Sequence, residues 1–189
     1  MTALSGFRLL LPPGWSRYRV DEDGRKQFFA KLSVRMKQIG NPELDVKLRM
    51  LANAQWRRLE QTGTHSVFFP DREVEGLAHL PISLAVRQHV APSGAAFAGG
   101  LGGLTRAPIE TFDTAIGPIQ RWQSETIGSD ENAGITTRAL GYGFALPGAD
   151  GRRGLVFLAS IPYADDADPV LVEGATELVD SIMETFRWR

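Results

Sequence analysis

The sequence predicts an α+β fold in which an antiparallel β-sheet of about six strands is covered by an N-terminal helix pair and a C-terminal helix. Three observations support this prediction: two helical apolar patterns fill residues 24–62, short β-rich stretches follow from residue 65 onward, and an amphipathic helix closes the chain. Consecutive short strands with tight connections favour an antiparallel meander over parallel crossovers. We expect residues 1–189 to form one domain, long enough to bury a sizeable core.

The N-terminal third begins with two extended pieces and continues as two helices. Phe7–Leu11 is expected to be a strand that stops at the Pro-Pro-Gly of residues 12–14, because proline cannot donate to a β-ladder and Pro-Gly favours a turn. Trp15–Val20 is a second extended stretch. Helices are expected over residues 24–39 and 41–62, and their short connection predicts an antiparallel pair.

The middle of the chain reads as strands separated by turn residues. The segment Ala91–Pro108, rich in Gly, Ala and Pro, interrupts these strands and is expected to be a mobile loop. The separators contain Gly-Pro, Gly-Ser-Asp and Pro-Gly sequences, which are typical of turns. The expected strands are Ser66–Phe69, Ile82–Val90, Glu110–Ile116, Ile119–Ile127 and Gly134–Leu146.

The C-terminal unit, residues 154–189, has the most consistent pattern. Leu155–Ile161 is mostly uncharged and β-rich, which indicates a strand covered on both faces. Asp168-Pro169 starts a helix, because Asp caps free backbone N–H groups and Pro suits the first helical position. We expect this helix to run to Phe186–Arg189 and its aromatic residues to close the core. Its apolar stripe is Leu171, Val172, Ala175, Leu178, Val179, Ile182, Met183 and Phe186.

The net charge of −1 hides an asymmetry along the chain. Residues 1–58 carry twelve of the 21 Lys and Arg but five of the 22 Asp and Glu, a balance of +7, and the remainder carries −8. Such a distribution can mark an electrostatic docking face, but the favoured interpretation is that the two parts attract each other within one fold or that the charges solvate helix faces. The candidate partner-binding residues are four basic residues of the second helix and two tryptophans: Lys47, Arg49, Arg57, Arg58, Trp15 and Trp56.

Several chemistries find no support in the residues. The chain has no cysteine, which excludes disulfides, thiolate metal sites and cysteine nucleophiles. His65, His79 and His89 lack the spacing of a metal motif, although His79 and His89 could meet across strands. The glycines of residues 99–103 are not followed by the Lys and Ser/Thr of a phosphate-binding loop. We therefore expect no metal and no cofactor.

An enzyme is not expected either, although this point stays open. No Gly-x-Ser-x-Gly nucleophile turn occurs, and Ser160 lies inside an apolar strand. The carboxylates Asp165-Asp166, or Glu125 with Asp113, remain possible acid–base groups, but nothing in the sequence singles them out. Nucleic-acid binding is not expected, because the basic residues are not aligned on one stripe and the chain is slightly acidic.

The sequence predicts a cytoplasmic protein. Its first residues lack the basic and apolar regions of a secretory leader. The longest uncharged stretch, from Val90 to Thr105, is short and contains Gly, Pro and Ser, so it does not predict a membrane span.

Both ends of the chain resemble known proteins. The apolar strand Phe7–Leu11 with the Pro-Pro-Gly-Trp that follows, and the closing Leu178–Ile182 with Phe186-Arg187-Trp188, resemble a group of uncharacterised actinobacterial proteins and, more distantly, the PsbP-like α/β fold. The resemblance covers roughly a quarter of the chain, and the helix pair departs from it. It implies an adaptor or assembly role with protein partners and an expected link to type VII secretion, and it implies no catalytic residue.

These observations favour a non-enzymatic interaction or adaptor module that docks a protein partner, for which a second copy of the chain is one candidate. The alternative is a small-ligand-binding or enzymatic domain with a pocket under Ala91–Pro108. An exposed patch containing Trp15 or Trp56 would favour docking, whereas a cleft with converging polar groups would favour the ligand-binding alternative.

Overall fold

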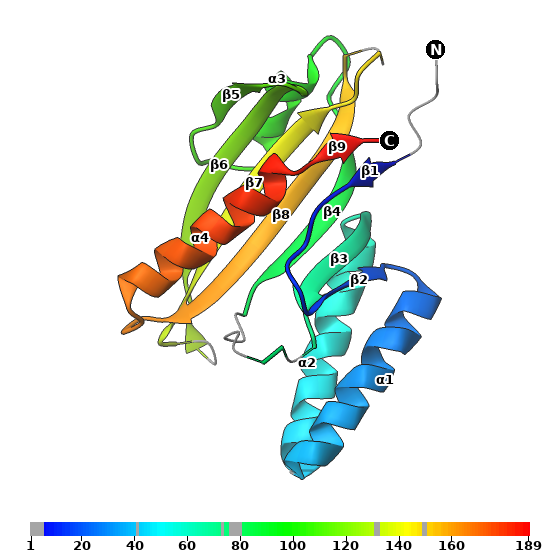
Figure 1. The fold of residues 1–189 in the computed structure, drawn as a ribbon, viewed down its shortest axis with the longest axis vertical. Coiled ribbons are helices and arrows are strands. Elements are labelled where there is room, and N and C mark those ends of the chain that lie inside the picture. Colours follow the sequence, from blue (N-terminus) through cyan, green and yellow to red (C-terminus); the bar gives the residue numbers. More distant parts are fainter. Residues whose placement is uncertain (1–5, 41, 73, 76–80, 131–132, 149–150) are drawn as a thin grey trace.

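The structure is a computed structural model, and it describes residues 6–40, 42–72, 74–75, 81–130, 133–148 and 151–189. The side chains of residues 35, 38, 39, 42–45 and 47 also lie outside the described part. The fold is α+β, with a seven-stranded antiparallel sheet, a two-stranded sheet and flanking helices (Figure 1), which confirms the predicted class. None of the described helices is long and apolar enough to cross a bilayer.

Figure 1 colours the elements in chain order, from blue at the N-terminus to red at the C-terminus. The strands are β1 (Phe7–Arg8), β2 (Trp15–Arg19), β3 (Thr64–Pro70), β4 (Ser83–Val90), β5 (Glu110–Thr114), β6 (Gly117–Ile127), β7 (Ile135–Ala145), β8 (Arg153–Ala164) and β9 (Arg187–Trp188). The helices are α1 (Glu22–Ile39), α2 (Pro42–Gln61), α3 (Phe97–Gly100), the 3-10 turn η1 (Leu101–Gly103) and α4 (Pro169–Glu184).

The large sheet has the strand order β2-β3-β4-β8-β7-β6-β5, and each neighbouring pair is antiparallel. Strands β6, β7 and β8 form the meander that the sequence predicted, and β4 joins it by pairing with β8. Because side chains alternate across a strand, β4 directs Val86 and Arg87 to opposite faces of the sheet. Two cavities, described below, therefore lie on opposite faces of β4.

Helix α4 covers one face of the sheet and builds the main core. Asp168 caps the helix by accepting a hydrogen bond from the Val170 backbone N–H at 2.9 Å, and Pro169 follows as predicted. Val179, Ile182 and Met183 are buried against β7 and β8. Leu171, expected in the apolar stripe, is instead 65% exposed, because the buried face of the helix is the side that carries Val172, Ala175 and Val179.

The expected continuation of this helix to the end of the chain is wrong. The helix ends at Glu184, and Arg187–Trp188 forms strand β9, antiparallel to β1. The Thr185 hydroxyl donates to the Ile182 carbonyl at 2.7 Å and accepts the Leu10 N–H at 2.9 Å, which ties the helix end to the segment that follows β1. Leaving the helix lets Phe186, 0% exposed, stack on Phe144 with ring centroids 4.0 Å apart.

The helices α1 and α2 lie on the opposite side of the sheet and extend beyond it (Figure 1). Asp21 caps α1 through the Gly24 N–H at 2.8 Å, and Gly40 ends it in the left-handed conformation with φ 71°. A small separate core joins the pair to the sheet through Tyr18, Trp56 and Val67.

The Gly-rich segment 91–108 is not the loop that its composition suggested. It contains α3 and η1, whose Phe97 and Leu101 are buried with Trp122 and Val156. Gly154 lets the Phe97 ring pack closely on strand β8, because a Cβ atom at that position would lie 2.5 Å from the ring. The segment therefore packs as a cover on the sheet face opposite α4.

Candidate functional site

A cavity of about 580 Å³ opens on the α4 face, between the β1–β9 pair and strands β4 and β8. We call it the groove. Its size falls in the range typical of small-molecule sites. Within the described residues, no group of three His, Asp or Glu is placed to hold a metal ion.

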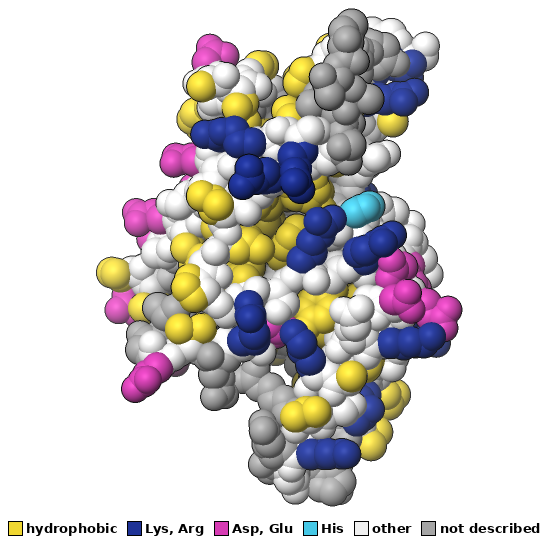
Figure 2. Space-filling view, turned by 45° about the vertical axis from the view of Figure 1, so that its right-hand side comes forward, with side chains coloured by type: hydrophobic (Ala, Val, Ile, Leu, Met, Phe, Trp, Pro, Cys, Tyr) yellow, Lys and Arg dark blue, Asp and Glu magenta, His cyan; other side chains and the backbone are white. Residues whose placement is uncertain are grey.

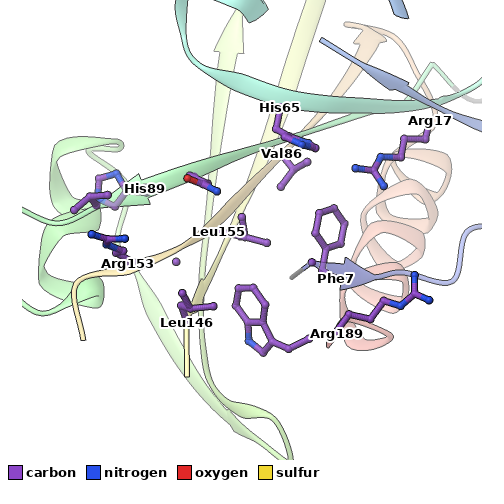
Figure 3. Close-up of a pocket in the computed structure, with 14 residues that line it drawn as sticks. Phe7, Arg17, His65, Val86, His89, Leu146, Arg153, Leu155 and Arg189 are labelled. Carbon is purple, nitrogen blue, oxygen red and sulfur yellow. The ribbon is translucent and has the colours of Figure 1, made fainter. Parts of the chain in front are cut away.

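The floor and walls of the groove are apolar. Val86 of β4 and Leu155 of β8 form the floor, while Phe7 and Trp188 form one wall and Leu146 another (Figure 3). The pairing of β1 with β9 places Phe7 opposite Trp188. The Phe7 ring also meets the buried Phe157 and Phe186 rings at 5.2 and 6.0 Å, so this wall is held by the core and is in place before any ligand arrives.

The rim of the groove is basic. Arg17, Arg153 and Arg189 line it together with Gln88, and no Asp or Glu does. In the part of the chain that the structure describes, none of these three arginines forms an ion pair with a carboxylate. Figure 2 shows an apolar yellow area bordered by dark-blue basic side chains, with one cyan histidine at its edge. Figure 3 shows Arg153 and Arg17 on opposite sides of the groove.

Arg17, Ser66 and His65 form a small network at one end. The Arg17 Nε and Nη2 groups both donate to Ser66 Oγ at 3.1 Å, and His65 Nδ1 lies 2.8 Å from the same oxygen. Because Ser66 Oγ accepts from Arg17, its single proton is free to go to His65 Nδ1. This arrangement makes the imidazole neutral with its proton on Nε2. Desolvation and the charges of Arg17 and Arg19 lower the pKa of His65, which agrees with that assignment.

The network is not a catalytic dyad. Ser66 is 0% exposed, so its oxygen is out of reach of a substrate, and it is already engaged by Arg17. The arrangement instead fixes the guanidinium, which also lies over the Phe7 and Phe68 rings at 5.5 and 5.7 Å. What remains available to a ligand is a set of positioned donors: the outer N–H groups of Arg17 and the Nε2–H of His65.

The sequence-predicted partner-binding residues lie elsewhere. Trp15 and Trp56 are 7% and 3% exposed and pack in two different cores. No exposed aromatic patch therefore forms at either position. Arg57 and Arg58 are exposed on α2, and Arg49 is half-buried on the same helix. Lys47 belongs to α2, but its side chain lies outside the described residues.

The structure describes two of the three histidines, His65 and His89, and both line the groove. His65 lies at its upper end in Figure 3, and the ring of His89 also lies edge-on to Phe97 with centroids 5.9 Å apart. His79 lies outside the described residues. Two of the four carboxylates left open as acid–base groups have structural partners: Glu125 accepts from Arg138 and Tyr163 at 2.9 Å, and Asp165 accepts from Thr136 at 2.8 Å. The other two, Asp113 and Asp166, are exposed.

The space under segment 91–108, where the sequence predicted a pocket, is filled by Phe97 and Leu101. The groove lies on the other face of the sheet. The sequence did not single out the arginines of the groove, because they are far apart in the chain. Strand pairings such as β1–β9 and β4–β8 bring them to the border of one cavity. One signal was present in the sequence. Arg17 lies two positions after the core residue Trp15 in a strand, and residues two apart lie on the same face of a sheet.

Comparison with known proteins adds little. No protein-family model and no curated protein matches the chain. Among solved structures, a mutant of the protein Mog1 superimposes with a TM-score of 0.45 and 14% identity, over 65% of this chain and 78% of that one. At this distance the similarity carries no functional argument, and the resemblance to PsbP-like and actinobacterial proteins stays an expectation.

Proposed function

We propose that the chain acts as a single non-catalytic binding domain whose groove takes an anionic ligand with an apolar body. The observation that carries this proposal is an apolar cavity of about 580 Å³ whose lining contains three arginines and no Asp or Glu. An apolar ligand body matches the aromatic and aliphatic walls, and an anionic head matches the rim. A neutral ligand would leave the rim uncompensated.

The energetics favour both halves of such a ligand. Burying apolar surface contributes about 25 cal/mol per Å². Arginine presents several N–H groups in a planar fork, and its hydrogen bonds to a carboxylate, phosphate or sulfonate contribute about 1.5–3 kcal/mol each. The Arg17 guanidinium is held in place by Ser66 before binding, so less side-chain entropy is lost there.

The head group is expected at the Arg17 and His65 end. His65 Nε2–H can donate to an anion in the neutral imidazole form, and an anion there would also favour protonation of the ring. Arg153 and Arg189 lie farther round the rim and add long-range attraction, which salt will screen.

A matched pair of fluorescent probes tests the proposal. 1-Anilinonaphthalene-8-sulfonate and N-phenyl-1-naphthylamine share an apolar ring system and differ by the sulfonate. We expect the anionic probe to bind at least about tenfold more tightly, the equivalent of one charge-assisted hydrogen bond. The triple variant Arg17→Gln/Arg153→Gln/Arg189→Gln should bind both probes equally.

The charge-matched control is Lys37→Gln/Arg57→Gln/Arg106→Gln, whose residues are exposed and do not line the groove. It should keep the preference for the anionic probe. Equal binding of the two probes by the unmodified protein, or an unchanged preference in the groove variant, would contradict the proposal.

A second candidate is docking of an acidic protein partner on the helix pair, within a cytoplasmic adaptor role. The observation that favours it is a set of exposed apolar residues on α1 and α2, namely Val34, Val46, Met50 and Leu51, at 60%, 59%, 69% and 48% exposure. They lie in the part of the chain with a balance of +7, so charge complementarity selects an acidic partner.

The test of this second candidate is binding of a purified partner, first recovered from lysate. Its affinity should fall at least about tenfold in Arg57→Glu/Arg58→Glu and should weaken with salt. A partner whose affinity is unchanged by this charge reversal would assign the interface to another surface. A self-association that survives the reversal would instead indicate a homodimer.

A further inference from the structure

A second, smaller cavity of about 150 Å³ lies on the opposite face of β4 from the groove, between α2 and strands β3, β4 and β8. Its lining includes Arg58 of α2 and Arg87 of β4, together with Leu59, Ala85 and Leu158. No Asp or Glu lines it. The strand alternation that directs Val86 to the groove directs Arg87 to this side.

Arg87 has an unmet hydrogen bond at this cavity. Its Nε atom is buried without a hydrogen-bond partner, and Arg87 has no ion pair within the described residues. Arg58, on the facing helix, also has no carboxylate partner in that part of the chain. A buried guanidinium N–H without an acceptor is costly, and such groups are ordinarily hydrogen-bonded.

The neighbouring hydroxyl groups do not supply the missing acceptor. Thr62 Oγ donates to the Leu59 carbonyl at 3.0 Å, so the 3.0 Å contact between Thr62 and Thr64 is a donation from Thr64. Neither hydroxyl makes a hydrogen bond to Arg87. The cavity is therefore lined by two arginines and by no Asp or Glu, which is a lining that suits an anion.

We propose that a small inorganic oxyanion, phosphate or sulfate, binds between Arg58 and Arg87 and links helix α2 to the sheet. Both guanidinium groups have N–H pairs that fit an oxyanion edge, and Gln55, which also lines the cavity, can donate through its amide. This site is distinct from the groove, because Arg58, Arg87 and Gln55 do not line the groove; Val86 of β4 lines both cavities.

Thermal unfolding in matched salts tests the proposal, with the four tryptophans as the fluorescence reporter. In phosphate at about ten times its Kd, the unmodified protein should unfold about 2–5 °C higher than in chloride of equal ionic strength. Arg87→Met removes the charge but keeps an apolar side chain of similar length. It should lose the phosphate-dependent rise, and in chloride it should unfold no lower than the unmodified protein, since the buried Nε–H without an acceptor is gone.

The control is Arg57→Met, on the same helix but exposed and outside the cavity. It should keep the full phosphate-dependent rise, which separates site binding from the general stabilisation that phosphate and sulfate give most proteins. The proposal is overturned if Arg87→Met responds to phosphate as strongly as Arg57→Met does, or if the unmodified protein shows no rise over chloride. The second result would mean that the cavity holds water only.

Discussion

Helix α4 and the helix pair both cover the sheet, but they do so very differently. Helix α4 places Val179, Ile182 and Met183 in the main core, and Asp180 on its edge accepts from Arg121 at 2.7 Å and from Tyr142 at 2.6 Å. The pair α1–α2 contacts the sheet through a small separate core and through the ion pair of Lys31 with Asp71. Exposed apolar side chains do not distinguish the two, since α4 also leaves Val170 and Leu171 exposed. One helix builds the main core, whereas the pair packs on the smaller one.

The way in which helix α4 ends explains where the groove forms. Helix α4 ends before the edge of its face, and the chain then turns into β9 and pairs with β1 instead of continuing as helix. The part of the face beyond the helix is therefore walled by Phe7 and Trp188 but not filled. Ligand sites are usually concave, mostly apolar and largely preformed, and the groove beside α4 has these features.

The largest effect is expected at the junction of α4 and β9. Phe186→Ala removes a ring that stacks on Phe144 and lies edge-on to Phe157 and Trp188. It should lower the free energy of unfolding by about 3–5 kcal/mol, because the cavity left behind cannot collapse fully. Urea unfolding monitored by circular dichroism measures this. A loss below about 1 kcal/mol would show that the junction is not part of the main core.

A smaller loss is expected when the polar link of α4 is removed. Asp180→Ala leaves the half-buried Arg121 and the buried Tyr142 without their acceptor and should cost about 2 kcal/mol. Burial and the bond to Asp180 raise the pKa of Tyr142, which shows how strongly its hydroxyl keeps the proton. The matched change Glu173→Ala, which removes an exposed partner of Arg138, should cost less than about 0.5 kcal/mol. Equal losses in the two variants would contradict the contrast between buried and exposed pairs.

The attachment of α1 to the sheet should be sensitive to acid. Burial alone raises the pKa of Asp71, but hydrogen bonds from Ser16, Tyr18 and Lys31 outweigh it and hold that pKa below its ordinary value. The folded state therefore gains stability from Asp71 above its unfolded pKa, and this gain is lost as the pH falls through the folded pKa. Asp71→Asn should cost about 1 kcal/mol at pH 7 and nothing at a pH below both values.

Unfolding free energies of the Asp71→Asn variant and the unmodified protein, measured across the acid range, check this prediction. A difference that stays constant with pH would assign the effect to packing and not to the charge of Asp71. The Lys31 ammonium, 2.9 Å from the Asp71 carboxylate, is half exposed, so added salt should reduce the difference only in part.

The smallest effects are expected at the outer part of the helix pair. Met50→Ser and Leu51→Ser change side chains that are 69% and 48% exposed and should alter the free energy of unfolding by no more than about 0.5 kcal/mol each. A larger loss in either variant would mean that the pair is buried in an assembly in solution, and sedimentation velocity would then show a mass above that of one chain.

Local patterns predicted the helices and the meander well, because caps, turns and apolar periodicity act over a few residues. Asp168-Pro169 begins α4, and Gly40 ends α1, as expected. The groove could not be predicted in the same way. Its walls depend on the pairing of Phe7 with Trp188, which joins the two ends of the chain, and on Phe186 leaving the helix to reach the core. Composition likewise failed at segment 91–108, where Phe97 and Leu101 outweigh the glycines around them.

The central claim is that an anionic ligand with an apolar body occupies the groove, and the four tryptophans allow a direct measurement. Trp188 lines the groove, whereas Trp15, Trp56 and Trp122 are buried in packed cores. In a two-dimensional ¹H–¹⁵N NMR titration with decanoate, the indole N–H signal of Trp188 should move and saturate, and those of Trp56 and Trp122 should stay in place. Movement of the Trp56 signal with a fixed Trp188 signal would place the ligand under the helix pair and contradict the account.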